Sequence, residues 1–173
     1  MITRWQEGDS QLINYRNENS WDCRDDRDRA DNLARNGIAF SIWEGSARAD
    51  TLLMILGMNF LWDGCAQVWA LPSHEARGHA RYMVESARVL MDVVAKKYRI
   101  HRYHTLIHPN LYENIKWIKL LGFQPESVLR SASPTKDNLI MYAKLYLEGY
   151  HEQTKDRRAR LETDVAKLLS MDH

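Results

Sequence analysis

Apolar residues in the first half of the chain gather in short runs that predict β-strands. Three such runs cover residues 38–43, 51–58 and 65–71. Gly45 and Ser46 predict a turn between the first two runs, and Asn59 with the Asp63–Gly64 pair predicts a turn between the last two. Short apolar runs bounded by turn signals are typical of buried strands. Because the connections are too short for a crossover helix, we expect the three strands to form an antiparallel meander.

After Pro72 the spacing of the apolar residues changes to that of a helix. A period of three to four residues predicts a long helix over residues 78–98, and its apolar positions are Met83, Ala87, Leu90, Met91, Val94 and Tyr98. Residues 99–108 then predict another strand. We therefore expect the strand–helix–strand unit over residues 65–108 to be parallel and right-handed.

Weaker patterns predict the first elements of the chain. Residues 1–6 favour a short strand, and Asp9 and Ser10 are candidate caps for a helix that continues to Tyr15. Charges of alternating sign over residues 21–37 are typical of a solvated helix face, with Gly37 as its stop.

The second half of the chain predicts further elements. Gly122 ends a short helix, as a left-handed cap would, and that helix has an apolar face made of Leu111, Ile115, Ile118 and Leu121. Residues 123–131 and 139–147 predict a pair of strands around a polar loop. The tail over residues 151–169 predicts a charged amphipathic helix whose thin apolar stripe is Leu161, Val165 and Leu168.

This order of elements predicts an α+β (mixed α/β) protein with a central, mostly antiparallel twisted sheet flanked by helices. We expect one domain over residues 1–150 and a charged C-terminal helical extension over residues 151–173. The apolar stripe of the extension is a candidate contact for a second copy of the chain or for another protein.

Composition narrows the class of protein. The chain has 173 residues, of which 45% are hydrophobic and 27% charged, as in an ordinary globular domain. Its formal net charge is only +1, which does not favour nucleic-acid binding by bulk electrostatics. Cys23 and Cys65 lack the spacing of metal ligands, so we expect free thiols and no metal site. The longest apolar run, residues 51–62, is too short to span a membrane, and we expect a cytoplasmic protein.

The segment between the third strand and the long helix carries candidate chemistry. It contains Arg77, Gly78, His79 and Ala80, directly before or within the first turn of the predicted helix. The backbone N–H groups at a helix N-terminus suit an anion, and a glycine lets that anion approach closely. The same small residues also suit simple helix packing, so the residues alone leave both interpretations open.

This segment resembles the pyrophosphate loop of the GNAT superfamily of acyl-CoA N-acyltransferases. That loop has Gln or Arg, two residues, Gly, one residue, and then Gly or Ala. Gly78 and Ala80 match the small positions, whereas Glu75 stands where the family has Gln or Arg. Residues 114–123 resemble the last core helix of the family and its closing Gly-Phe. Ile118 stands where that helix often has the tyrosine that protonates the departing CoA thiolate. The departures are similar to those of divergent GNAT-like proteins encoded by tailed phages.

The resemblance implies transfer of an acetyl group from acetyl-CoA to an amine of a small molecule or protein. It assigns the backbone around Ala70 and Leu71 to the acyl carbonyl and the pantetheine. It assigns CoA binding to Arg77, Gly78, His79, Ala80 and Asn110. No metal is implied.

The sequence alone does not identify the general base and the general acid of the reaction. His108 and Tyr112 follow the strand near which the thiol should arrive, and Glu44 lies on the meander, where the family sometimes keeps a carboxylate base. Each also has a purely structural interpretation: His108 as a half-exposed residue of the sheet, Tyr112 as a side chain that covers the short helix, and Glu44 as a turn residue. The alternative function is a catalytically inactive GNAT-like phage protein in virion assembly, in the virion, or bound to a host protein; its place would be the host cytoplasm.

Overall fold

The computed structural model describes residues 1–14, 26–45, 50–146, 163, 165–167 and 169–170. Within them, seven strands form one sheet in the order β1-β2-β3-β4-β5-β7-β6. The strands are β1 (Ile2–Arg4), β2 (Ile38–Trp43), β3 (Leu52–Trp62), β4 (Cys65–Pro72), β5 (Arg102–Ile107), β6 (Gln124–Leu129) and β7 (Leu139–Leu145). Only β4 and β5 pair in parallel, so the predicted α+β class with a mostly antiparallel sheet is confirmed.

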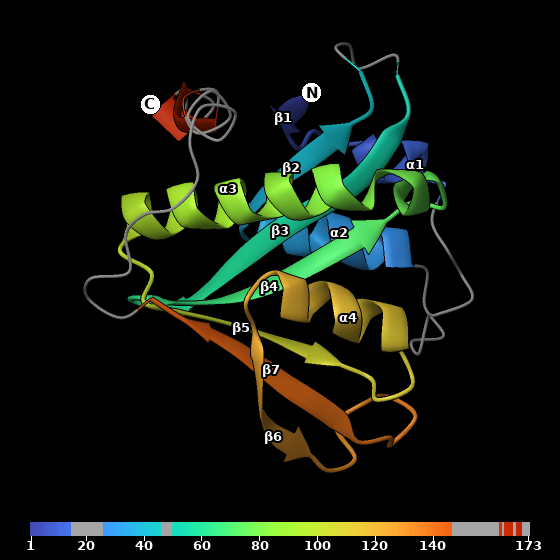
Figure 1. Ribbon diagram of the computed structural model, residues 1–173, viewed down its shortest axis with the longest axis vertical. Coiled ribbons are helices and arrows are strands. Elements are labelled where there is room, and N and C mark those ends of the chain that lie inside the picture. Colours follow the sequence, from blue (N-terminus) through green and yellow to red (C-terminus); the bar gives the residue numbers. More distant parts are fainter. Residues whose placement is uncertain (15–25, 46–49, 147–162, 164, 168, 171–173) are drawn as a thin grey trace.

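Helices cover both faces of the sheet (Figure 1). They are α1 (Asp9–Leu12), α2 (Asp26–Arg35), the 3₁₀ turn η2 (Glu75–His79), α3 (Ala80–Tyr98) and α4 (Tyr112–Leu120). Met54, Leu56 and Met58 of β3 belong to the core under α3, whereas Ile55 belongs to a smaller core with Ala30 of α2. This alternation along one strand is the expected result of burying both faces of a sheet.

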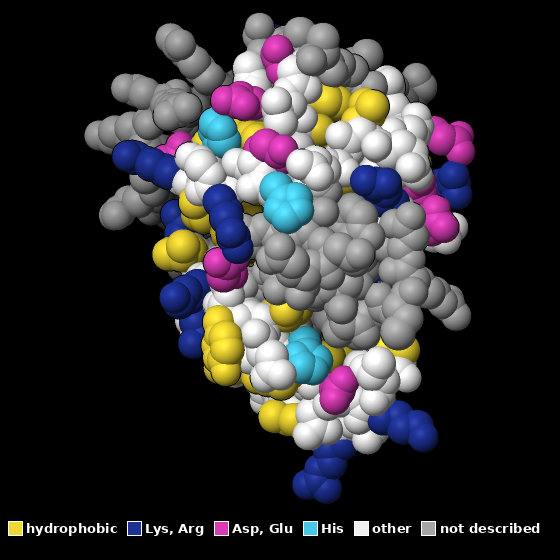
Figure 2. All heavy atoms as spheres, turned by 90° about the vertical axis from the view of Figure 1, so that its right-hand side faces the viewer, with side chains coloured by type: hydrophobic (Ala, Val, Ile, Leu, Met, Phe, Trp, Pro, Cys, Tyr) yellow, Lys and Arg dark blue, Asp and Glu magenta, His cyan; other side chains and the backbone are white. Residues whose placement is uncertain are grey.

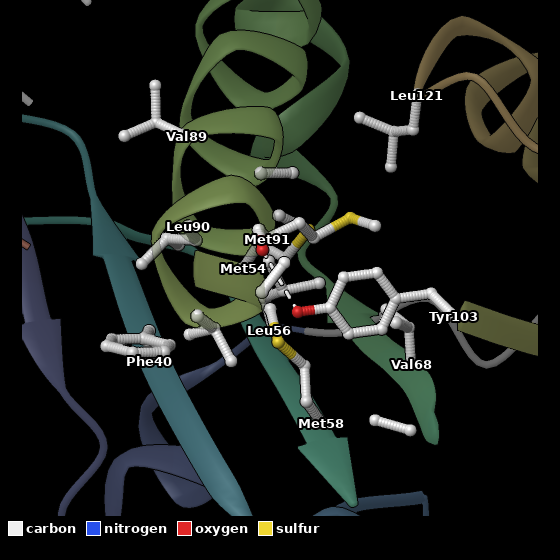
Figure 3. Close-up of a cluster of buried hydrophobic side chains, with 14 of the residues drawn as sticks. Phe40, Met54, Leu56, Met58, Val68, Val89, Leu90, Met91, Tyr103 and Leu121 are labelled. Carbon is white, nitrogen blue, oxygen red and sulfur yellow. Dashed lines mark hydrogen bonds between the residues drawn. The ribbon is translucent and has the colours of Figure 1, made fainter. Parts of the chain in front are cut away.

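The larger core is closed by contacts between α3 and the sheet. Figure 3 shows Phe40, Leu56 and Leu90 among its apolar side chains. The hydroxyl of Tyr103 donates a hydrogen bond of 3.0 Å to the carbonyl of Met91 in α3. Burial raises the pKa of this phenol, so its proton stays in place to make the bond. The predicted meander and the parallel pairing of residues 65–108 are both confirmed.

Strands β4 and β5 pair over only part of their length. Their three aligned pairs end at Gln67 and His104, although β4 continues to Pro72 and β5 to Ile107. On its other side β4 stays paired with β3 up to Pro72. The carboxyl ends of β4 and β5 therefore diverge, as Figure 1 shows. They leave a gap in strand pairing, because no described strand pairs with the β5-facing edge of β4 beyond Gln67.

Two predicted turn or cap residues have other roles in the structure. Asn59 lies inside β3, because it pairs with Gln67 and its amide donates to the carbonyls of Leu33 and Asn36 at the end of α2. The N-cap of α1 is Gly8, with φ of 96°, and α1 ends at Leu12. Asp9 instead accepts hydrogen bonds from the Gln6 N–H and the Ser41 hydroxyl. Tyr15 lies outside the described residues.

Helix and strand ends also differ by a few residues from those predicted. The long helix begins at Ala80 and is preceded by η2, because residues 75–79 take tighter 3₁₀ geometry. Gly122 follows α4 with φ of 93°, which confirms the predicted left-handed position.

The C-terminal residues that the structure describes are helical and pack on the main core. Val165 and Leu169 are buried, and the amine of Lys97 in α3 donates to the Leu169 carbonyl at 2.6 Å. Val165 of the predicted stripe thus contacts its own chain, which leaves it unavailable to a partner. Leu161 and Leu168 lie outside the described residues, and the division at residue 150 stays a prediction.

Candidate active site

The N-cap position of α3 is His79, and its side chain makes no capping hydrogen bond to the helix. Gly78 is exposed, and a Cβ built there would meet nothing within 4 Å. Beside it lies an open depression lined by Gly78, His79, Arg81, Tyr82 and Glu85. Packing therefore does not explain the glycine, and an anion could reach this backbone.

Ser73 and Glu75 make hydrogen bonds in the segment that leads into α3. The buried Ser73 hydroxyl accepts the Ala76 N–H at 3.3 Å. Glu75 accepts a hydrogen bond of 2.9 Å from the Asn14 side chain, beyond the end of α1. That bond, with contributions from the backbone of Glu75, Ser73 and His74, outweighs partial burial and lowers the pKa of Glu75. Glu75 is thus an ionised carboxylate where the resembling family has Gln or Arg.

Carboxylates also face the basic residues of this segment. His79 Nε2 lies 3.3 Å from Glu44 Oε1, which follows β2. Arg77 lies 3.4 Å from the Glu113 carboxylate on α4, and Arg81 lies 3.1 Å from Glu85. Figure 2 shows acidic, basic and histidine side chains mixed on the side of the molecule where α3 begins. The structure therefore brings Glu44 and His79 together, although the sequence predicted separate roles for them.

Ala70 and Leu71 differ in the direction of their backbone groups. The Ser73 N–H donates to the Leu53 carbonyl of β3, and the β3–β4 register is regular from there back through Leu71. Because alternate residues of a strand bond to the same side, Leu71 also faces β3. The N–H and carbonyl of Ala70 face the β5 side, where strand pairing has ended.

The Trp69 ring lies against β3 and not in the gap between β4 and β5. Its indole lies against Gly57 of β3, where an added Cβ would stand 2.2 Å from the ring. Its Nε1–H donates to Asn59 Oδ1 at 2.6 Å. The ring is therefore held on the β3 side of β4, away from β5.

His108 lies directly after β5, and each of its ring nitrogens has a polar neighbour. Nδ1 accepts the Asn110 N–H at 3.2 Å, and Nε2 lies 3.8 Å from Asp137 Oδ2 in the β6–β7 loop. Asp137 is in turn held by the Thr135 hydroxyl at 2.6 Å. A neutral His108 in this arrangement carries its proton on Nε2, toward the carboxylate. The structure thus joins His108 with Asn110 and adds Asp137, which sequence reasoning missed.

Tyr112 and Ile118 lie on opposite sides of α4. Tyr112 is 69% exposed at its first turn, and no described contact joins it to His108. Ile118, which stands where the family usually has its acid, is buried in the main core. Nothing on α4 at that position can donate a proton.

A buried pair lies where β4 and β5 still touch. Cys65 Sγ is 3.9 Å from His104 Nδ1. Burial raises the pKa of the Cys65 thiol despite Arg102. Burial, then Arg102, lowers the pKa of His104, and Glu126 opposes this weakly. Both groups are therefore neutral near pH 7, and both are inaccessible to a substrate.

The described ranges hold no candidate for two other features, a metal site and a membrane-spanning helix. No three His, Cys, Asp or Glu side chains there come together as a candidate metal site. No described helix is both long and apolar enough to cross a bilayer.

Asp137 and Glu113 could not have been selected from the sequence. Each is one acidic residue among many, and each gains a partner only when distant elements fold together. Glu44 and His79 are 35 positions apart, so their contact likewise has no local signal.

Solved structures share this architecture. A putative phosphinothricin N-acetyltransferase matches with a TM-score of 0.65 and 11% identity, over 86% of this chain and 99% of that one. A point mutant of spermidine N-acetyltransferase from Vibrio cholerae matches with a TM-score of 0.61 and 14% identity, over 84% and 94%. The ribosomal-protein-S18-alanine N-acetyltransferase from Escherichia coli matches with a TM-score of 0.61 and 12% identity, over 89% and 99%.

No protein-family model matches the sequence, and neither does any curated protein. At such low identity the structural likeness shows the fold alone. The chain therefore has the fold of the GNAT N-acetyltransferases.

Proposed function

We propose that this protein is an N-acyltransferase that moves an acetyl group from acetyl-CoA to an amine of a small molecule or protein. The observation that carries the proposal is the divergence of β4 and β5 at the end of the sheet where α3 begins. The gap in strand pairing suits a pantetheine chain laid along the edge of β4, and the N-terminus of α3, where the His79 side chain makes no capping bond, suits its diphosphate. The open space at Gly78 fits such an anion.

Acetyl-CoA would supply the acyl group as a thioester. The N–H of Ala70 would stabilise negative charge on the acyl oxygen during attack by the amine. The new C–N bond replaces the C–S bond, so the amine must lose a proton and the departing sulfur must gain one. Gly78, His79 and Ala80 would hold the diphosphate, with Arg77 and Asn110 beside them.

The proposed proton-transfer residues are His108 and Tyr112. His108 is supported by its place at the end of β5, by the hydrogen bond from the Asn110 N–H and by the nearby Asp137 carboxylate, since a positioned imidazole is a common base. Tyr112 is supported by its exposure at the start of α4. For Glu44, the contact with His79 favours a role beside the diphosphate over proton transfer. The reaction would take place in the cytoplasm.

The alternative is a GNAT-like protein without catalysis, acting in phage assembly, in a virion, or on a host protein. Two observations favour it. Ile118 is a core residue at the position where the family usually has its general acid, and Glu75 is a carboxylate in residues 75–81, the proposed anion-binding segment. Neither observation removes the gap or the N-terminus of α3, which is why the enzyme is preferred.

Calorimetric titration with acetyl-CoA and with CoA tests the proposal. Micromolar binding that is lost in Gly78→Glu and kept in Gly78→Ala supports it. Both variants should fold, because a side chain at this position meets no neighbour. Thiol release from acetyl-CoA is then screened with spermidine and with a peptide that begins with alanine, the acceptors named for the structural neighbours. Absence of binding at millimolar ligand would overturn the enzyme proposal.

A further inference from the structure

The anion-binding segment carries more negative than positive charge. Within the described part of the chain, residues 75–81 and their ion-pair partners contain two arginines, one histidine and four glutamates, namely Glu44, Glu75, Glu85 and Glu113. Even with the histidine protonated, the carboxylates outnumber the cations. A diphosphate approaching Gly78 would therefore meet a locally acidic surface, although the chain as a whole is near neutral.

Three of these glutamates lie outside residues 75–81, and two of them, Glu44 and Glu113, come from other elements. Their partners, His79 and Arg77, lie on either side of Gly78 in the sequence. Glu113 belongs to α4 and contacts Arg77 with both carboxylate oxygens at 3.4 Å. Glu44 follows β2 and contacts His79. By contrast, Glu85 is one helical turn from Arg81, whose side chain is 91% exposed, which is an ordinary surface pair.

The Arg77–Glu113 and His79–Glu44 pairs are weak enough for a ligand to replace the glutamates. Their distances are 3.3–3.4 Å, and both glutamates are at least half exposed. Exposed pairs of this kind contribute little to stability, because solvent screens them. A phosphate oxygen offers arginine and histidine the same kind of acceptor as a carboxylate oxygen, so a ligand can replace the glutamates at little cost.

We propose that in the free protein Glu44 and Glu113 form ion pairs with His79 and Arg77, the cations that would bind the diphosphate. This competition sets a low affinity for CoA and acetyl-CoA. This inference rests on the proposed function. In the bound state Arg77 and His79 turn to the diphosphate, while the displaced carboxylates stay nearby and repel it. Removing either negative charge frees a cation and removes a repulsion, so both effects raise affinity.

The test compares CoA binding by calorimetry for the wild-type protein, Glu44→Gln, Glu113→Gln and the double variant. Each single variant should bind CoA about two- to fivefold more tightly, as expected for the loss of one exposed ion pair. The double variant should combine the two gains, because the pairs share no residue. The matched control is Glu7→Gln, which makes the same change of charge in the Glu7–Arg35 pair outside the segment. Thermal unfolding without ligand checks that all variants fold.

The outcomes separate the two proposals. Tighter binding by both single variants with no change in Glu7→Gln supports the inference. Unchanged or weaker binding by Glu44→Gln and Glu113→Gln overturns it, and the proposed function stands if Gly78→Glu still abolishes CoA binding. If neither the wild-type protein nor any glutamine variant binds CoA, both proposals fail.

Discussion

Trp69 and Gly57 face each other on neighbouring strands, and the indole ring fills the space that a side chain at position 57 would need. A Cβ at Gly57 would stand 2.2 Å from two ring carbons. The register aligns these residues directly, and the Nε1–H of the ring bonds to Asn59 two positions further along β3. This packing keeps the largest side chain of β4 on the side of the strand away from β5.

Gly57→Ala should destabilise the protein by about 1–3 kcal/mol, the usual cost of overpacking a core. The added methyl group must push the Trp69 ring away from Asn59, which also strains the hydrogen bond. Denaturant unfolding measures the loss. The matched control is Gly78→Ala, which meets only open space and should change the free energy of unfolding by less than about 0.5 kcal/mol. Equal stability of Gly57→Ala and wild type would contradict this account.

Asn59→Ala should lower stability by about 1–3 kcal/mol, because it leaves polar partners without their bonds. The side chain joins three groups: the carbonyls of Leu33 and Asn36 and the Trp69 indole. Hydrogen exchange should show the last turn of α2 opening more readily in this variant. Asn36→Ala is the control, since among the described residues that exposed side chain bonds only to the Asn32 carbonyl, four positions earlier in the chain. A smaller effect at Asn59 than at Asn36 would refute the prediction.

Ala70→Pro should abolish most acyl transfer while CoA binding persists. Proline removes the N–H proposed to stabilise the acyl oxygen, and loss of one such donor typically costs 10²- to 10³-fold in rate. The substitution spares the β3–β4 ladder, because the Ala70 N–H faces away from β3. Leu71→Pro removes an N–H on the β3 side and should destabilise the fold instead. Thiol release and thermal unfolding distinguish the two variants; full activity of Ala70→Pro would exclude this donor.

Stability should fall between pH 7 and 5 through His104. Burial lowers the folded-state pKa of His104 below its usual 6.5, so the unfolded chain binds a proton in this range before the folded protein does. The stabilising contribution of the neutral ring is therefore present above pH 6.5 and is lost as pH falls through the folded-state pKa. His104→Gln should show a flatter stability profile over this range. NMR titration should place the imidazole midpoint below 6.5, and a midpoint above it would reverse the sign of the prediction.

Elements whose signal is local were predictable from the sequence. The strand Ile38–Trp43 matches its prediction, and β4 and α3 differ from theirs by only one or two residues at an end. Their periodicity depends on residues that are close in the chain and is the direct result of burying one or both faces. Gly122 was likewise predictable, because a left-handed residue after a helix strongly favours glycine.

Asn59 shows where local signals fail. Asparagine usually favours turns, but here its amide is satisfied by α2 and by Trp69, two partners far away in the chain. Long-range hydrogen bonds of this kind outweigh intrinsic preference and have no local signal. The sequence therefore predicted a turn where the tertiary structure extends the strand.

The sequence by itself determined the order of elements, the class of sheet and the small residues Gly78 and Ala80 before the long helix. The tertiary structure alone decided where the divergence of β4 and β5 begins, beyond Gln67 and His104, and that Ala70 rather than Leu71 faces the gap. It also decided that Glu44 and Glu113 meet the cations of the anion-binding segment and that Asp137 meets His108. The physical reason is the range of the interaction: periodicity and turn preference act over a few residues, whereas strand register and charge pairing join residues that only the completed fold brings together.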